Sequence, residues 1–340
     1  MNSFWLFRSD LRILESYHQY TSLEEFKKHC WDFYLLQGIY FLENNYFDEV
    51  IIWRLQPKIK QKEIVFNING KRFIQRWVDN FNEIVKYPKA DISFFRGGFK
   101  EYDILTQQHS KHLGLKLYLS AGIRILPQWK GIYDYILIES EREFNIVNNC
   151  IPFYKTANPL IFKPLNLQKK YDICWPCNWT QERYKGQESF IKMVSNSTYL
   201  KKLKIIHIGN QPLKGQNMCK KYKVENIEFI GHTNRESLNV YLNQSKLGLV
   251  TSNLTDGCPR ISTEILMSGT PLVISETTRL LSLYKQSEGV SETTEITMSY
   301  GILRILTNLS YAQNCINIKI KNEISFDKLC KKNIENWQKL

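Results

Sequence analysis

The sequence contains no long apolar run. None of its 340 residues belongs to a stretch of the ~20 consecutive apolar residues that a membrane-spanning helix needs. The N-terminus, MNSFWLFRSDLRILES, is interrupted by Arg8, Asp10 and Arg12, and it lacks the basic start and long apolar centre of a secretory signal. We therefore expect a cytoplasmic protein, either free or held peripherally at the inner face of a membrane.

Cysteine and metal-binding patterns are also sparse. The eight cysteines are scattered apart from Cys174 and Cys177, so we expect reduced thiols and no disulfide framework. A single Cys-x-x-Cys pair without a second pair does not make a zinc site. A redox role for the pair remains open, but a structural role is favoured because the residues after Cys177 continue the pattern described below. No Asp-x-Asp metal motif is well placed, so neither a metal nor another cofactor is expected.

The chain is long and apolar enough for packed cores, and it is strongly basic. At 340 residues, of which 43% are hydrophobic, two domains with separate cores are the default expectation. The formal net charge of +13 indicates an anionic partner, which can be a phosphate ligand, a membrane surface or nucleic acid. The densest basic segment runs from Arg54 to Arg76 and holds seven cations against one acid, Glu63.

Short apolar segments alternate with amphipathic ones along the chain, which is typical of an α/β fold with parallel sheets. In the first half we expect strands over residues 3–7, 49–54, 91–95, 115–119 and 135–139, one helix over residues 23–44, and a hairpin around Asn69-Gly70. The proline-containing segment 151–170 lacks periodicity and is interpreted as a linker. A second alternation follows it. The expected domains are residues 1–160, residues 170–325 and a terminal helix over residues 326–340.

The most distinctive segment runs from Asp256 to Glu264 and continues to Gly269-Thr-Pro271. One acid opens a loop that contains Gly257, and the second acid lies eight residues later. A loop that leads into a helix points backbone N–H groups and the positive end of the helix at an anion. A carboxylate one turn inside such a helix accepts hydrogen bonds from sugar hydroxyls. These are the physical requirements for holding a nucleotide diphosphate sugar.

Residues 171–285 resemble the donor-binding domain of GT-B glycosyltransferases and are most similar to glycosyltransferase family 4. Four blocks agree in order and spacing, although Asp256 stands where that family normally has Glu. The N-terminal half resembles the family only in its alternation of strands and helices, and Arg8-Ser9-Asp10 replaces the glycine-rich loop expected after the first strand. The four blocks are Arg183-Tyr-Lys185-Gly186-Gln, Ile205-Ile-His-Ile-Gly209, Asn226-Ile-Glu-Phe-Ile-Gly231, and Asp256 to Glu264 with Gly269-Thr-Pro271.

The resemblance implies a GT-B fold, in which two Rossmann-like domains face a central cleft. It also implies retaining, metal-independent transfer of a hexosyl or pentosyl group from a nucleotide diphosphate sugar to a hydroxyl. Glu264 would bind the ribose, Asp256 the transferred sugar and Lys185 the departing diphosphate. The alternatives are an ordinary helix glutamate, a turn aspartate and a solvated basic loop. The further expected donor contacts are Arg183, Gly209, Gly231, Gly257, Cys258, Arg260 and Ile261.

The acceptor is expected on the N-terminal domain. It would be a surface glycan or a lipid-linked saccharide, with basic residues holding the enzyme at an anionic membrane. One alternative is DNA carrying hydroxymethylated bases, as in phage DNA glycosyltransferases, and a second is a non-catalytic protein that binds a nucleotide sugar or nucleic acid. A solvated hairpin face and a plain turn are the structural alternatives for the candidate acceptor contacts. These contacts are Arg54, Lys58, Lys60, Lys62, Arg72, and the possible anion nest Arg96, Gly97 and Gly98.

Overall fold

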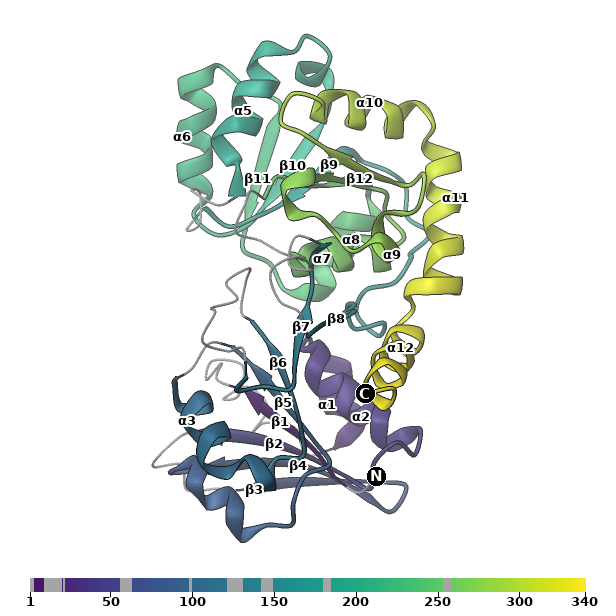
Figure 1. The fold of residues 1–340 in the computed structure, drawn as a ribbon. Helices are drawn as coiled ribbons and strands as arrows, with labels where there is room; N and C mark the ends of the chain where they lie inside the picture. Colours follow the sequence, from purple (N-terminus) through teal and green to yellow (C-terminus); the bar gives the residue numbers. More distant parts are fainter. Residues whose placement is uncertain are drawn as a thin grey trace. The chain divides into compact units, whose positions relative to one another are not determined.

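The computed structural model describes residues 3–8, 20, 22–55, 63–97, 100–120, 131–141, 149–179, 185–252 and 258–340. The chain divides into two compact units, each built around one β-sheet (Figure 1). Unit 1 consists of Met1–Tyr154 with Cys330–Leu340, and unit 2 consists of Lys155–Leu329. The chain therefore passes from unit 1 to unit 2 and returns. Both units are α/β, which confirms the predicted fold class.

The sheet of unit 1 has eight strands in the order β3-β4-β2-β1-β5-β6-β7-β8 within the described residues. All neighbours are parallel except the β3–β4 hairpin, whose turn residues Asn69 and Gly70 have φ values of 51° and 79°. The predicted hairpin is thereby confirmed, since a two-residue turn of this kind needs positive φ at both positions. The strands are β1 (Ser3–Arg8), β2 (Glu49–Leu55), β3 (Glu63–Ile68), β4 (Lys71–Val78), β5 (Ile92–Arg96), β6 (Leu115–Leu119), β7 (Tyr135–Ile138) and β8 (Cys150–Pro152).

The expected single helix over residues 23–44 is wrong, because two helices occupy this segment. Helix α1 (Leu23–His29) ends before Cys30, and α2 (Phe33–Glu43) begins after Asp32. The Asp32 carboxylate accepts hydrogen bonds from the N–H groups of Tyr34 and Leu35, so it acts as the N-cap of a new helix. The other described helices in the N-terminal part of unit 1 are η3 (Phe81–Lys86), α3 (Lys100–His109) and η4 (Ser110–His112).

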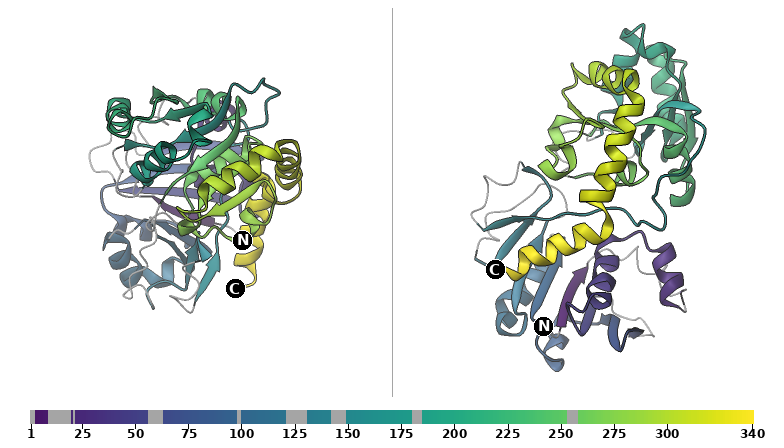
Figure 2. Two further views of the ribbon diagram at one scale, coloured as in Figure 1. Left: turned by 90° about the horizontal axis from the view of Figure 1, so that it is seen from above. Right: turned by 90° about the vertical axis from the view of Figure 1, so that its right-hand side faces the viewer.

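Aromatic side chains fill both faces of the unit 1 sheet. On one face Phe7 stacks on Phe95, with ring centroids 4.5 Å apart, beneath α3. On the other face, helix α12 (Phe326–Gln338) brings Trp337 onto Phe4 and Phe153, at 5.9 Å and 6.3 Å. The C-terminus of the chain is therefore part of the core of unit 1, as the yellow helix in Figure 2 shows.

The sheet of unit 2 is parallel throughout, with six strands in the order β11-β10-β9-β12-β13-β14 within the described residues. The strands are β9 (Tyr171–Pro176), β10 (Ile205–Ile208), β11 (Ile227–Gly231), β12 (Ser245–Val250), β13 (Leu272–Ser275) and β14 (Val290–Thr293). Helices α5 (Gln187–Asn196), α6 (Pro212–Tyr222) and α10 (Met298–Thr307) share one core with the sheet. Helices α7 (Arg235–Asn243) and α8 (Arg260–Met267) contact β12 and each other.

Several short elements complete unit 2. They are η8 (Leu200–Lys202), η9 (Glu276–Thr278), α9 (Ser282–Lys285), α11 (Leu309–Lys319) and a π-helical turn, Ile320–Ile324. No helix in the described part of the chain is long and apolar enough to cross a membrane.

The strand order of each sheet locates the edge at which a ligand is expected. In unit 2 the chain runs from β9 outward to β11, then returns to β12 on the other side of β9. In unit 1 the same reversal occurs between β1 and β5. Ligands of open parallel sheets bind outside the carboxyl ends of the strands at such switch points.

Candidate functional site

The switch point of unit 2 brings Lys185 to the end of β12. The hydroxyl of Thr251, which follows β12, donates a hydrogen bond to the backbone carbonyl of Lys185. The same hydroxyl accepts a hydrogen bond from Trp175 Nε1 of β9 at 3.1 Å. Thr251 thus fixes the backbone at the start of α5 against the two central strands, and Lys185 keeps a partly exposed side chain there.

Two glycines, Gly186 and Gly209, allow the backbone to approach closely at this edge. Gly186 has a φ of +63°, and a Cβ atom on it would lie 2.3 Å from the carbonyl oxygen of Thr251. A Cβ atom on Gly209, which follows β10, would lie 1.8 Å from the carbonyl oxygen of Cys177. The N–H of Gly209 donates to the carbonyl of Gly231, at the end of β11, over 2.9 Å. Side chains are therefore excluded from these positions.

Helix α8 starts at the same edge, directly after Pro259. Arg260 is exposed in its first turn and Ile261 is partly exposed, whereas Cys258 before the helix is buried. The side chain of Pro259 has no hydrogen-bonding group with which to cap the helix, so backbone N–H groups in the first turn favour an anion.

The Gly269-Thr-Pro271 segment ends α8 and starts β13. Gly269 has a φ of +72°, and its N–H donates to the carbonyl of Leu266 over 2.9 Å. Helix α8 also packs tightly on β12, because a Cβ atom on Gly248 would lie 2.6 Å from Ile265. This close packing sets the position of α8, and with it the position of Glu264, relative to the switch point.

Glu264 forms an ion pair with Arg235, the first residue of α7. Arg235 Nη1 lies 2.7 Å from one oxygen of the carboxylate and 2.9 Å from the other. The Glu264 side chain is 2% exposed and that of Arg235 is 35% exposed. The buried carboxylate therefore has a cationic partner that itself reaches solvent. Sequence reasoning missed Arg235, because its separation from Glu264 along the chain follows no motif.

Comparisons with known proteins agree with this geometry. Residues 180–321 match the family described as glycosyl transferases group 1. No curated protein sequence matches the chain. Solved structures align over nearly the whole chain. The sucrose-phosphate synthase of Thermosynechococcus elongatus has 11% identity and a TM-score of 0.67, with 100% of this chain and 99% of that chain covered.

Two further structures align over the full length of both chains. The Anabaena protein Alr3699/HepE in complex with UDP has 10% identity, a TM-score of 0.66 and 100% coverage of each chain. The UDP-forming α,α-trehalose-phosphate synthase of Burkholderia vietnamiensis has 8% identity, a TM-score of 0.62 and 100% coverage of each chain.

The chain has the GT-B fold, and its residues 180–321 form a glycosyl transferases group 1 domain. The group 1 match includes α5, the switch point and α8, so the elements described above lie within the matched domain. The finer assignment to glycosyltransferase family 4 stays a prediction. Among the predicted donor residues, the structure brings Lys185, Gly209, Gly231, Cys258, Arg260, Ile261 and Glu264 to one edge of the unit 2 sheet. Arg183, Asp256 and Gly257 lie outside the described residues.

The surroundings of the Cys174–Cys177 pair favour a structural role. Cys174 and Cys177 are free thiols, and burial raises the pKa of both. Cys177 Sγ lies 3.3 Å from Nε2 of His207, a fully buried histidine whose pKa burial lowers to about 4. Protonated thiols beside a neutral imidazole are poor nucleophiles. No metal-binding cluster of His, Cys, Asp or Glu occurs among the described residues.

The described arginines of the basic segment from Arg54 to Arg76 lie in different surroundings. Arg54 lies one residue before the end of β2 and is 1% exposed, whereas Arg72 lies near the start of β4, where it pairs with Glu49 at the start of β2. Successive side chains of a strand point to opposite faces of the sheet, and this alternation separates Arg54 from Arg72. Lys58, Lys60 and Lys62 lie outside the described residues.

Arg76 and the predicted anion nest of Arg96, Gly97 and Gly98 contact different residues. Arg76 pairs with Glu63 and lies over the ring of Tyr87, 3.9 Å from its centroid. Arg96 ends β5. Gly97 follows it with a φ of +106°, and the Gly97 N–H donates to the Leu119 carbonyl at 3.0 Å. Gly98 lies outside the described residues.

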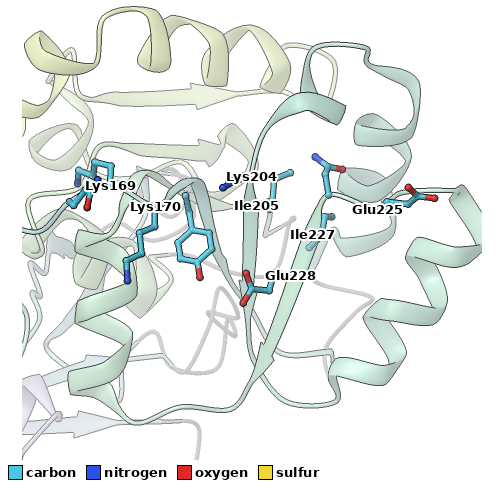
Figure 3. A pocket seen from close by; sticks show the side chains of 10 residues that line it. Lys169, Lys170, Lys204, Ile205, Glu225, Ile227 and Glu228 are labelled. Carbon is cyan, nitrogen blue, oxygen red and sulfur yellow. The ribbon is translucent and has the colours of Figure 1, made fainter.

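A groove of about 630 Å³ opens on unit 2 at the other edge of its sheet (Figure 3). Its lining includes Tyr171, Ile205 and Ile227, which begin β9, β10 and β11. Lys170, Lys204 and Glu228 surround them. Because ligands of parallel sheets bind at the carboxyl ends, this groove is not the donor site.

Proposed function

We propose that this glycosyltransferase binds a nucleotide diphosphate sugar at the carboxyl edge of β9 and β12. The observation that carries this proposal is the convergence of Lys185, Gly186 and the Arg235–Glu264 pair at the switch point of a parallel sheet. A uridine diphosphate sugar is the first donor to test. Structurally similar proteins include one in complex with UDP and one described as UDP-forming.

The residues at this edge divide into two chemical roles. Lys185, Arg260 and the N-terminus of α8 supply positive charge for the diphosphate. Fixed cations lower the barrier most when charge develops on the leaving group. Glu264 accepts hydrogen bonds from the ribose hydroxyls. Its two oxygens offer about four lone-pair directions, so an acceptor position remains beside each contact with Arg235.

The transfer is proposed to proceed with retention and without a metal. The sugar gains positive charge as its bond to the diphosphate breaks, and the acceptor hydroxyl attacks from the face that the leaving group departs. The leaving phosphate accepts the hydroxyl proton. Asp256 would hold the transferred sugar. The acceptor binds to unit 1. A surface glycan, a lipid-linked saccharide and hydroxymethylated DNA remain candidate acceptors in that order.

The experiment is a donor screen followed by a hydrolysis assay. UDP-, GDP- and dTDP-sugars are compared by thermal shift, because a ligand at 100 times its Kd stabilises by about 2.7 kcal/mol. The best donor is then incubated with the enzyme and with EDTA, and release of the nucleotide diphosphate is measured. NMR of the product sugar with a trapped acceptor reports the anomeric configuration. An enzyme that neither binds nor cleaves any of these donors would contradict the proposal.

A further inference from the structure

Lysines precede two neighbouring strands of the unit 2 sheet. Three of them lie in or just after η8, before β10, and three lie at the end of α6, before β11. Because β10 and β11 are parallel neighbours, with Ile205 opposite Ile227, the two turns lie side by side at the amino edge of the sheet. The six lysines are Lys201, Lys202, Lys204, Lys220, Lys221 and Lys223.

Asn226 fixes the two turns to each other. Its side-chain amide donates hydrogen bonds to the carbonyls of Leu200 and Leu203, at 2.8 Å each. The N–H of Ile205 donates to the backbone carbonyl of Asn226 at 3.2 Å. The lysines therefore project from a backbone that the fold itself holds in place.

The groove shown in Figure 3 continues this surface toward the middle of the sheet. Lys204 lines the groove together with Lys170, which precedes β9, and β9 is the neighbour of β10. Lys170 and the six lysines of the two turns are all exposed. We call these seven residues the lysine patch.

Few acidic side chains oppose the lysine patch. Residues 198–228 contain seven lysines, no arginine, no aspartate and only two glutamates. Two other acids nearby are already paired, since Asp172 lies 2.7 Å from Lys246 and Glu188 lies 3.4 Å from Lys221. The patch therefore keeps a net positive charge, which raises the local concentration of anions.

The dipole of α6 explains only part of this charge. Lys220 and Lys221 lie in the last turn of that helix, where cations are favourable. The effect falls off within one turn, so it does not account for the three lysines before β10. Lys223 has a φ of 55° at a position where glycine or asparagine is usual. Glycine would avoid the backbone strain of this conformation, which indicates that the charge of Lys223 has a use.

We propose that the lysine patch binds the surface of a membrane that contains anionic phospholipids. Lysine ammonium groups are compact charges on flexible stems, which suits headgroups that adopt many positions. Tyr199 and Tyr222, which adjoin the patch in the sequence, are partly exposed, and tyrosine is enriched at membrane–water interfaces. The inference goes beyond the proposed function, because it names a partner whose binding needs no sugar donor.

A lipid surface fits the patch better than a nucleic acid does. The patch contains no arginine, whose planar fork matches phosphates and base edges. Glu225 and Glu228 line the groove among the lysines. A nucleic acid strand holds its phosphates at fixed spacing, so some of them would meet these carboxylates. Lipid headgroups diffuse independently and can gather beside each lysine.

The lysine patch and the proposed donor site lie at opposite edges of one sheet. Strand β9 has six residues, and at about 3.3 Å per residue it separates the two edges by roughly 20 Å. Lys185 and Glu264 lie at the carboxyl edge, whereas the patch lies at the amino edge. A membrane bound to the patch therefore leaves the donor edge open to a soluble nucleotide.

The first experiment measures co-sedimentation of the full chain with vesicles, without nucleotide. The vesicles consist of phosphatidylcholine with increasing fractions of phosphatidylglycerol. Binding of the parent should rise with the anionic fraction and fall with added salt. A patch variant that combines Lys201→Gln, Lys202→Gln and Lys204→Gln should bind about a hundredfold more weakly, because each lysine near an anionic surface contributes a factor of about five.

A matched control removes the same charge from unit 1. It combines Lys28→Gln, Lys86→Gln and Lys111→Gln, which replace three exposed lysines, and it should bind vesicles as the parent does. The thermal unfolding midpoints of both triple variants should match that of the parent, because the substituted side chains are exposed.

A second patch variant tests the turn before β11 and replaces the first variant if that one does not fold. It combines Lys220→Gln with Lys223→Asn, since asparagine tolerates the left-handed backbone at position 223. We expect it to weaken vesicle binding by about tenfold or more.

Three results would overturn the inference. The first is a parent that does not bind anionic vesicles, and the second is an equal change, or no change, in the patch variants and the control. The third is tighter binding to a double-stranded DNA fragment than to vesicles at the same salt concentration, lost in the patch variants, which would assign the patch to nucleic acid. Failure of the proposed donor would leave all three measurements unaffected, because vesicle binding is measured without nucleotide.

Discussion

The Arg235–Glu264 pair permits the sharpest prediction, because its two members differ in exposure. Arg235→Gln leaves the Glu264 carboxylate buried without its ionic partner. A fully buried unpaired charge costs about 3–5 kcal/mol, but solvent reaches the 35% exposed Arg235 site and reduces this cost. We expect Arg235→Gln to lower the free energy of unfolding by about 1–3 kcal/mol. For a unit of this size each kcal/mol lowers Tm by about 2–4 °C.

Glu264→Gln should affect stability less, and UDP binding more, than Arg235→Gln does. It leaves a partly exposed arginine that water can solvate, so the loss of stability should stay below about 1 kcal/mol. It should weaken UDP binding by about ten- to a hundredfold, because charged hydrogen bonds to the ribose contribute about 1.5–3 kcal/mol. Arg235→Gln should weaken UDP binding too, since Glu264 loses its orientation.

A double-mutant cycle tests whether Arg235 acts through Glu264. Unfolding by urea and calorimetry with UDP are measured for the parent, both single variants and the double variant. We expect Arg235→Gln to have little further effect on UDP binding when Glu264 is already Gln, and the double variant to recover part of the stability that Arg235→Gln alone loses. Strictly additive effects on both quantities would refute the reasoning. Arg304→Gln, at the exposed pair with Glu288, is the matched control and should change neither quantity appreciably.

Three further predictions concern residues of unit 2. Lys185→Ala should lower kcat by about 10²–10³ with a smaller change in KM, because its charge is needed as the diphosphate departs; steady-state kinetics that show only a KM effect would contradict this role. Gly186→Ala should destabilise the protein by more than about 1 kcal/mol in urea unfolding, because φ is +63° and the new Cβ meets the Thr251 carbonyl at 2.3 Å. Gly70→Ala, with a φ of +79° in open space, should cost less, and equal costs would show that the close contact is unimportant. Burial lowers the pKa of His207 from 6.5 to about 4, so the unfolded state takes up a proton at this residue first as the pH falls. The free energy of unfolding should therefore be fully present above pH 6.5 and fall by up to about 3 kcal/mol between pH 6.5 and pH 4. A His207→Phe variant with the same pH dependence would rule this group out.

The sequence by itself determined the fold class and most of the strands, and it located the candidate donor motif. Buried parallel strands such as β1 and β13 are short continuous apolar runs, and a signal of this kind does not depend on distant residues. Turn chemistry is equally local, so Asn69-Gly70 predicted the hairpin correctly. Local signals also have limits, because the cap at Asp32 divides a segment whose apolar periodicity appeared continuous.

Only the tertiary structure decided which distant side chains meet. Arg235 and Glu264 lie 29 positions apart on separate helices, and their contact depends on how α7 and α8 pack against β12. Arg8 and Arg96 are likewise brought together by strand order, because β1 and β5 are neighbours in the sheet although they are distant in sequence. Spacing along the chain predicts contacts within one helix or strand, whereas the order and packing of elements decide contacts between them.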